Sequence, residues 1–287
     1  MSTIEDVLTL DTTGLSPLTS PVLVVALTGW FDVAGAATSA LAQLGEAGVT
    51  VGEIDPDPFY DFTQERPMVE LVDGETRQVT WPTNEFRVVR TGAAHDLVVL
   101  DGVEPHLAWP LYVACARRVV EQLGCVAVVT LGATADAIPH TRMPPVVGSS
   151  ADRELARRLA LSAPSYQGVT GLIGVLHVEM ERAGVPTISL RVGVPHYLGH
   201  TEHPLAVAAL VRHLAHVLGL PIAVDLGDAA ERWSALHDEA VADDEQLQAY
   251  VRMLEVEYDR RAEAILEGGD DIASRFEEYL RDHRDDD

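Results

Sequence analysis

The chain has 287 residues, 47% of them hydrophobic, and can therefore bury one large core or a core with an appendage. Its formal net charge of −25 argues against nucleic acids and anionic membranes as partners, because neutralising phosphates requires clustered Lys or Arg. All 20 basic residues are arginine, which excludes Walker-A, Schiff-base and phosphate-clamping lysines.

The cysteine content and the N-terminal sequence indicate in which cellular compartment the protein is expected. Cys115 and Cys125 are too few for a disulfide framework or a cysteine-based zinc site, and they suit a reducing environment. The N-terminus lacks the basic and apolar regions of a signal peptide, and no apolar run approaches the ~18 residues of a membrane span. We therefore expect a cytoplasmic protein.

Strand-like and helix-like patterns alternate through most of the chain. The run Val22–Leu27 is continuously apolar, as is typical of a strand buried on both faces. In chain order, the expected elements are strand 22–27, helix 34–44, strand 49–54, strands 86–90 and 96–100, helix 106–123, strand 126–131, helices 152–161 and 172–183, strand 187–192 and helix 204–218. This order predicts an α/β fold with a parallel or mixed sheet flanked by helices, opening with a βαβ unit.

Two segments depart from the alternation. Residues 56–85 carry Asp73-Gly74 between two strand-like runs, which predicts a β-hairpin insert lying over one end of the sheet. Residues 228–287 hold 20 acids and 7 arginines, with apolar residues at helical spacing. We expect two or three amphipathic helices there, with a break at Gly268-Gly269 before a final helix. The predicted organisation is an α/β domain over 1–225 and an acidic helical extension over 226–287.

Polar residues after the first expected strands are candidates for a site, because α/β proteins bind ligands at the carboxyl ends of strands. Gly29, Trp30 and Asp32 end the first strand, although Asp32 equally suits an N-cap of the next helix. Glu104 and Asp101, with Glu85, could supply an acid–base pair. In a tight turn, however, Asp commonly bonds its own backbone.

The segment Pro139–Arg142 carries the most suggestive pair. His140 is of the residue type that titrates near neutral pH in free peptides, and Arg142 offers a bidentate fork for a carboxylate or phosphate. With Ser149 and Ser150 nearby, the segment would suit a hydrolase or phosphorylase, but no G-x-S-x-G elbow is present. Arg142 is equally suited to pairing with Glu or Asp across a subunit interface.

Histidines also cluster near the end of the last strand. His200 and His203, with His196 close by, have the spacing of a metal pair but lack the helical H-E-x-x-H order. With eleven histidines in the chain such a coincidence is expected, and we predict no metal and no other cofactor.

Seven short stretches, in this order and spacing, together resemble the family of the second proteasome assembly chaperone along almost the whole chain, and the acidic helical end resembles its actinobacterial branch. These stretches are Gly29-Trp30-Phe31-Asp32, Trp81-Pro82, Gly102-Val103-Glu104-Pro105, Leu131-Gly132-Ala133, Pro139-His140-Thr141-Arg142, Gly171-Leu172-Ile173-Gly174-Val175-Leu176 and Val194-Pro195-His196-Tyr197.

The resemblance implies an α/β fold similar to phosphorylase/hydrolase-like sandwiches, a small homo-oligomer such as a trimer, and no established catalysis. It also implies proteasome-related partners, since eukaryotic relatives chaperone proteasome α-ring assembly. Relatives that dock into proteasome pockets end in a hydrophobic-Tyr-any motif. The end of this chain, 281–287, departs from that motif, and so we do not expect docking by tail insertion.

Two hypotheses follow. The first is a non-enzymatic, oligomeric, chaperone-like binding protein without catalytic residues. The alternative is a phosphorylase- or hydrolase-type enzyme acting on a small anionic or nucleoside-like substrate. In both, the predicted binding residues line a crevice at the strand ends and are Gly29, Trp30, Asp32, Glu104, His140, Arg142, His196 and Tyr197.

Overall fold

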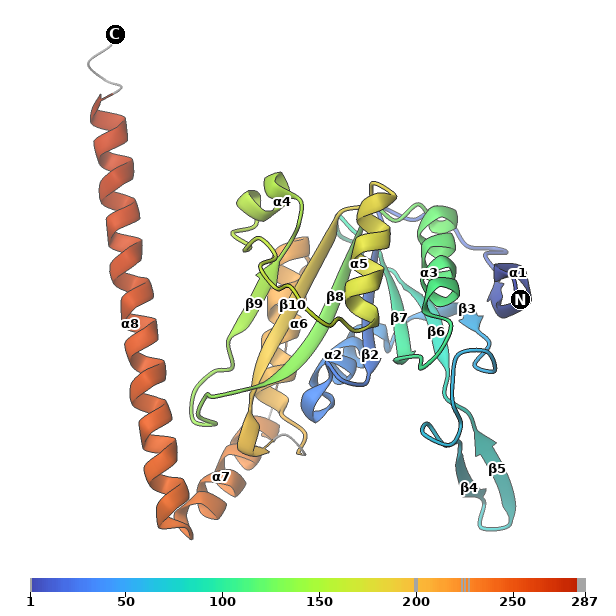
Figure 1. Ribbon diagram of the computed structural model, residues 1–287, viewed down its shortest axis with the longest axis horizontal. Helices are drawn as coiled ribbons and strands as arrows, with labels where there is room; N and C mark the ends of the chain where they lie inside the picture. The colour runs from blue at the N-terminus through green and yellow to red at the C-terminus, as the bar shows by residue number, and fades with distance from the viewer. Residues whose placement is uncertain (1, 199–200, 223, 225, 227, 283–287) are drawn as a thin grey trace.

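The computed structural model describes residues 2–198, 201–222, 224, 226 and 228–282, of which 264–282 are described by their backbone alone. Its centre is an eight-stranded sheet with the strand order β1-β3-β6-β7-β2-β8-β10-β9 (Figure 1). The strands are β1 (Leu8–Leu10), β2 (Val22–Thr28), β3 (Val49–Ile54), β6 (Asn84–Val89), β7 (Leu97–Val103), β8 (Ala127–Asp136), β9 (Val146–Ser149) and β10 (Thr187–Pro195).

The sheet is mixed. β7, β2, β8 and β10 are parallel neighbours, whereas β1, β3 and β6 at one side and β9 at the other pair antiparallel. The two strands of the expected βαβ opening, β2 and β3, are not neighbours in the sheet, because β6 and β7 lie between them. Both edge strands are short, with three residues in β1 and four in β9.

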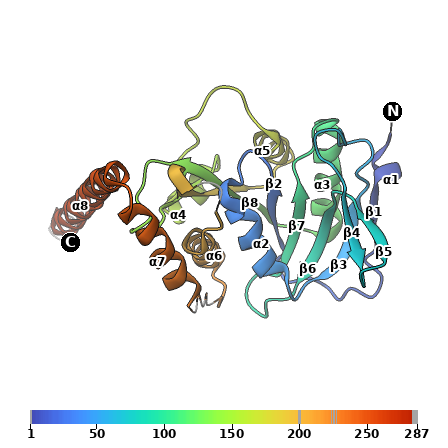
Figure 2. The same cartoon turned by 90° about the horizontal axis from the view of Figure 1, so that it is seen from below.

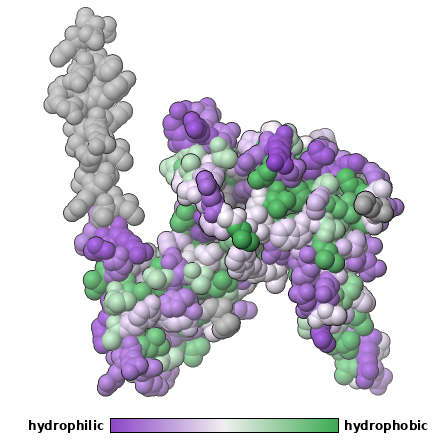
Figure 3. Space-filling model, viewed as in Figure 1, coloured by the Kyte–Doolittle hydropathy of each residue, from purple (hydrophilic) through white to green (hydrophobic). Residues whose placement is uncertain are grey.

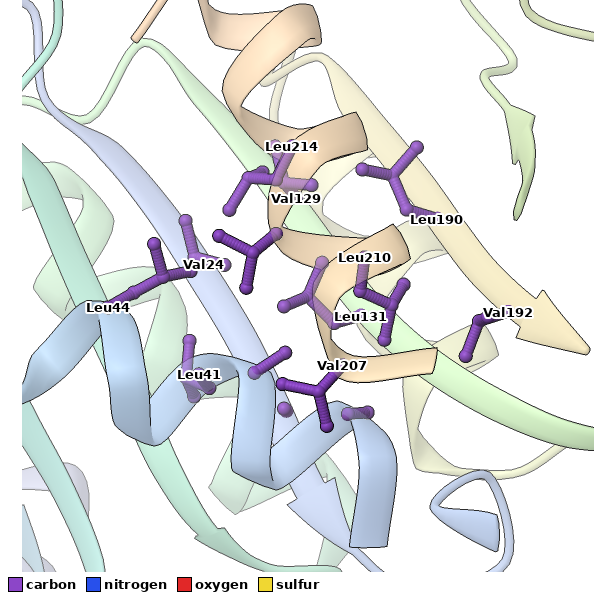
Figure 4. Packing of buried hydrophobic residues seen from close by; sticks show 14 of the residues in the cluster. Val24, Leu41, Leu44, Val129, Leu131, Leu190, Val192, Val207, Leu210 and Leu214 are labelled. Atoms are coloured by element: carbon purple, nitrogen blue, oxygen red, sulfur yellow. The ribbon is translucent and has the colours of Figure 1, made fainter. Parts of the chain in front are cut away.

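Helices cover both faces of the sheet, as Figure 2 shows. One face packs against α2 (Ala36–Gly45) and α6 (Pro204–Leu218), and the other against α3 (Trp109–Leu123) and α5 (Leu172–Arg182). Side chains of β2 alternate between the two cores, because successive residues of a strand point to opposite faces. Figure 4 shows Leu190 of β10 and Val24 of β2 beneath Leu210 and Leu214 of α6.

The predicted fold class is confirmed, and several element boundaries match. Strand 49–54 and helix 204–218 fall where they were predicted. β8 and β10 run further than expected, to Asp136 and Pro195, because Leu131-Gly132-Ala133 continues the strand instead of forming a loop. The edge strand β9 was not predicted. It precedes the short helix α4 (Arg153–Arg158).

The predicted hairpin is present as β4 (Met68–Val72) and β5 (Thr76–Thr80). Residues 73–75 connect the last pair, Val72 and Thr76, and Asp73 and Gly74 have φ of 55° and 75°, left-handed conformations typical of tight hairpin turns.

Its expected position over the end of the sheet is wrong. Every residue of both strands is exposed, and the hairpin projects away from the sheet (Figure 1). By strand alternation, Glu70 lies on one face of the hairpin and Arg77 on the other. Neither face can therefore be buried without removing a charge from water.

Two helices follow the α/β part, α7 (Ala229–Ala242) and α8 (Glu245–Asp282). The expected break at Gly268-Gly269 and the separate final helix are wrong, since the backbone of α8 is continuous there. Three short helical segments complete the chain, α1 (Ile4–Val7), η1 (Val33–Gly35) and η2 (His196–Leu198). In the described ranges, no helix has both the length and the apolar character needed to cross a bilayer.

Candidate functional site

The structure distributes the predicted binding residues over two groups at the carboxyl ends of parallel strands. The first group, with Gly29, Trp30, Asp32 and Glu104, surrounds the ends of β2 and β7. The second group, with His140, Arg142, His196 and Tyr197, lies beyond β8 and β10 and contacts α7 and α8.

Glu104 joins three elements in the first group. Its Oε1 accepts a hydrogen bond from the backbone N–H of Leu172 (2.9 Å) at the start of α5, and its Oε2 accepts one from Trp30 (3.4 Å). A Cβ at Gly29 would lie 2.8 Å from Oε2, so only glycine leaves room there. Because a carboxylate at a helix N-terminus also satisfies free backbone donors, Glu104 has a positioning role here.

Asp32 is an N-terminal cap of α2. Its Oδ1 accepts from the backbone N–H groups of Ala37 (2.8 Å) and Thr38 (3.2 Å), and its Oδ2 accepts from the Thr38 hydroxyl (2.5 Å). The side chain is buried and its oxygens are occupied, as the capping interpretation predicts. Trp30, in contrast, is 66% exposed and packs on Phe31.

His140 is buried at the centre of the second group. Its backbone N–H donates to the Tyr197 hydroxyl (2.9 Å), and that hydroxyl lies 2.8 Å from His140 Nδ1. His140 Nε2 lies 3.1 Å from Asp238 Oδ1 on α7. Burial raises the pKa of Tyr197 to about 12, so its O–H stays protonated and donates to Nδ1. This network assigns the Nε2–H tautomer to His140, which then donates to Asp238.

Arg142 and its neighbour bind carboxylates of α8. Arg142 Nε and Nη2 donate to the two oxygens of Asp259 (2.9 and 2.8 Å), and Nη1 donates to Glu255 (3.2 Å). The Thr141 hydroxyl donates to the same Glu255 oxygen (2.5 Å). Hydrogen bonding from Arg142 lowers the pKa of Asp259. The anion-binding fork predicted for Arg142 is thus occupied by a carboxylate of its own chain.

Further contacts extend this attachment along α8. The Tyr258 hydroxyl donates to the Met143 carbonyl (2.7 Å). His196 lies between Tyr250 Oη (3.3 Å from Nε2) and the Asp136 carbonyl (3.2 Å from Nδ1). We call the bonds of residues 141–143 to Glu255, Tyr258 and Asp259 the loop–helix contact.

A buried stack of aromatic rings attaches α7 to the α/β part and was not predicted. His203 stacks on Trp233 (ring centroids 4.1 Å apart), which in turn packs on His237 (4.2 Å). His203 Nδ1 accepts from the Ala206 N–H (3.4 Å) and so caps α6. Within the described residues, His203 Nε2 and Trp233 Nε1 are buried without a hydrogen-bond partner. His200, which has the spacing of a metal pair with His203, lies outside the described residues.

Acid should weaken this stack. Burial, with smaller effects from His237 and His140, lowers the pKa of His203 to about 4, below the 6.5 of a free histidine. Between pH 6.5 and 4 the unfolded chain therefore binds more protons. The contribution of neutral His203 to the free energy of unfolding is fully present above pH 6.5. About 3 kcal/mol of it is lost as the pH falls toward 4.

Chemical denaturation at several pH values tests this prediction. In His203→Asn the cap acceptor is kept and the titration is lost, so stability should fall less steeply with acid than in the parent. His177, whose pKa burial also lowers to about 4, leaves a residual slope in both proteins. Equal slopes for the two proteins would contradict the assignment to His203.

The serine and cysteine side chains considered as nucleophiles are buried or already hydrogen-bonded, and they lie away from the second group. The Ser150 hydroxyl is buried and donates to the Thr187 carbonyl (2.7 Å). Cys115 and Cys125 are buried, and burial raises the pKa of their thiols to about 11 and 12. Over the described residues, no three His, Cys, Asp or Glu side chains are grouped to hold a metal ion. The geometry suits recognition of another polypeptide, since its donors already bind a helix.

Comparisons with known proteins agree with the fold. The PAC2 family model matches residues 26–241. A crystal structure of a PAC2 family protein from Streptomyces avermitilis is 36% identical, with 80% of this chain and 99% of that chain covered and a TM-score of 0.73.

Two proteins from Mycobacterium tuberculosis are also similar. A proteasome-assembly chaperone homologue is 36% identical over 80% of this chain and 99% of its own, with a TM-score of 0.71. A protein of unknown function is 28% identical over 90% of both chains, with a TM-score of 0.77. No curated protein sequence matches the chain. The resemblance predicted from the sequence is confirmed, and the chain belongs to the PAC2 family.

Proposed function

We propose that this protein is a non-enzymatic binding factor with a chaperone-like role, which works as a small homo-oligomer in the cytoplasm and has proteasome-related partners. The observation that carries the proposal is the loop–helix contact, in which Arg142 holds Asp259 with two hydrogen bonds. Similarity to a proteasome-assembly chaperone homologue at 36% identity supports the partner class. In this proposal, residues 1–225 form the binding body and 226–287 an acidic arm.

The loop offers groups that match successive positions of a helix. Glu255, Tyr258 and Asp259 have the i, i+3, i+4 spacing of one helix face. The loop meets them with a hydroxyl, a guanidinium and a carbonyl. An acidic helix with this pattern, whether α8 of the same chain, α8 of another copy or a helix of a partner, can satisfy the same donors.

The contact is also weak enough to be exchanged. Arg142 and Asp259 are 34% and 50% exposed, and ion pairs of this kind contribute about 0–1 kcal/mol each. A partner helix of equal charge could thus replace the ion pairs of α8 at little cost, provided that it also supplies apolar side chains in place of the buried Val251 and Leu254. The enzymatic alternative is less well supported, because the Arg142 fork and the Ser150 hydroxyl are both occupied.

Arg142→Ala should loosen the attachment of α8 without unfolding the body. We expect the free energy of unfolding to fall by at most about 1 kcal/mol, because the lost pairs are exposed. Amide hydrogen exchange within 245–263 should rise, while that of β2 and β8 stays unchanged. Arg158→Ala, which also removes an exposed arginine in an ion pair, is the matched control and should leave α8 protected.

Light scattering after size exclusion and capture of proteasome subunits from the native cell extract test the function itself. The proposal expects an oligomer and captured subunits, with capture altered by Arg142→Ala and not by Arg158→Ala. A monomer that captures no proteasome subunit would contradict the proposal. A thermal shift with nucleosides or phosphate that Arg142→Ala abolishes would favour the enzyme instead.

A further inference from the structure

The β4–β5 hairpin is a two-stranded sheet that no described part of the chain covers. Each strand pairs only with the other, which leaves an unpaired edge on both sides. Val69 and Leu71 are 59% and 61% exposed and share a face with Val79, which is 46% exposed. Figure 3 shows hydrophobic surface (green) beside hydrophilic surface (purple) on the projecting hairpin. Since an isolated hairpin is marginally stable in water, this one is suited to gaining a further strand.

Two hollows lie at the base of the hairpin. The first, of about 400 Å³, has a lining that includes Glu53, Asp57, Val79 and Trp81. The second, of about 310 Å³, has a lining that includes Thr28, Trp81, Glu85, Arg87 and Asp101. Trp81 lines both hollows and is 46% exposed, so the apolar hairpin continues directly into them.

A row of carboxylates crosses the floor of these hollows. Glu53 of β3 lies directly opposite Glu85 of β6, and Glu85 lies directly opposite Asp101 of β7. Side chains in such positions share one face of the sheet, and like charges there are unfavourable. Arg87 binds Glu85 (2.8 and 3.1 Å) and lies close enough to lower the pKa of Asp101, but among the described side chains neither Asp101 nor Glu53 forms an ion pair. Burial has the larger effect and raises the pKa of Asp101, which means that keeping its carboxylate charged is unfavourable. A bound cation would offset this unfavourable free energy.

We propose that the hairpin and the carboxylate row dock an extended, arginine-bearing segment of a partner protein. The segment adds as a strand to the hairpin edge and lays apolar side chains on Val69, Leu71 and Val79. Arg77 on the same face keeps its guanidinium in water, so the segment covers this face only in part. Its guanidinium enters the smaller hollow, between Asp101 and the face of Trp81. Charge complementarity favours this occupant, because a guanidinium matches the row formed by Glu53, Glu85 and Asp101.

This surface shares no residue with the loop–helix contact, and so its test is independent of the proposed function. The probe is a fluorescent ten-residue peptide of alternating valine and threonine that ends in two arginines. Its matched partner carries citrulline, the neutral isostere, in place of both arginines. Fluorescence anisotropy with the full-length protein reports binding of each peptide.

The arginine peptide should bind at least tenfold more tightly than the citrulline peptide. Asp101→Asn and Glu53→Gln should each weaken the arginine peptide at least threefold and leave the citrulline peptide unchanged. Both variants should fold, because each relieves repulsion. Val69→Thr, on the apolar face, should weaken both peptides. The control Glu46→Gln removes an exposed charge outside the hollows and should change neither.

Three results would overturn the proposal. Equal affinity for the two peptides would show that the carboxylate row does not recognise the charge of arginine. Full displacement of the arginine peptide by spermidine at similar concentration, with no effect of Val69→Thr, would indicate a site for small free cations. Loss of self-association in Val69→Thr, measured by sedimentation, would show that a second copy occupies the hairpin.

Discussion

Replacing Asn84 with alanine is expected to lower the free energy of unfolding by about 3–5 kcal/mol, because it leaves the Tyr112 hydroxyl and the Val103 N–H without their acceptor and removes one of the two hydrogen bonds of the Tyr60 hydroxyl. The fully buried Asn84 amide donates to the Tyr60 hydroxyl, and its oxygen accepts from the Tyr112 hydroxyl (2.8 Å) and the Val103 N–H (3.2 Å). Burial raises the pKa of Tyr60 to about 12, so its hydroxyl stays protonated at neutral pH. Urea denaturation followed by circular dichroism measures the loss.

Tyr112→Phe is the matched control for this prediction. It removes one donor while the Val103 N–H still binds the Asn84 oxygen, and the expected loss is about 1 kcal/mol. If Asn84→Ala destabilised the protein no more than Tyr112→Phe, the network would not act as a unit. Gly102 belongs to the same arrangement, since a Cβ there would clash with the Asn84 side chain and lie 2.7 Å from the Thr83 carbonyl.

The second large effect is expected at Trp233. Replacing it with alanine removes the buried ring between His203 and His237. We expect the free energy of unfolding of the part that contains α7 to fall by about 3–5 kcal/mol. Because this ring attaches α7 to the α/β part, amide hydrogen exchange throughout α7 and the first turns of α8 should rise sharply.

The control for Trp233 lies on the same helix. Leu236 is 64% exposed, and Leu236→Ala should leave exchange and stability nearly unchanged. Equal effects of the two substitutions would mean that α7 is held by its backbone connections alone. A rise in exchange that spread into β8 and β10 as well would show that α7 supports the central sheet.

Much of the fold could be predicted from the sequence because its elements are locally encoded. Val22–Leu27 is apolar at every position, and Asp32 precedes a helical pattern, so the buried strand and its capped helix follow from neighbouring residues alone. The hairpin followed from Asp73-Gly74 in the same way.

Contacts between distant residues could not be predicted. Arg142 was suited to any carboxylate, and its partner Asp259 lies 117 residues away. The excess of acids after residue 228 was a signal for such a pairing, but it could not identify which turn of α8 would face the loop. Asn84 carried no signal, because its three partners come from separate elements. The capping role of His203 was not predicted either, because the sequence showed only its spacing from other histidines.

The burial of both cysteines has a consequence for covalent chemistry. Cys115 and Cys125 keep their protons at neutral pH, and a chain without lysine offers no side-chain amine. Electrophiles that acylate amines or alkylate thiolates therefore find no reactive side chain of either type on the folded protein. No tag can be joined to it through a lysine isopeptide bond. A factor that works beside a protein-degrading machine would by this composition be exempt from lysine-directed marking.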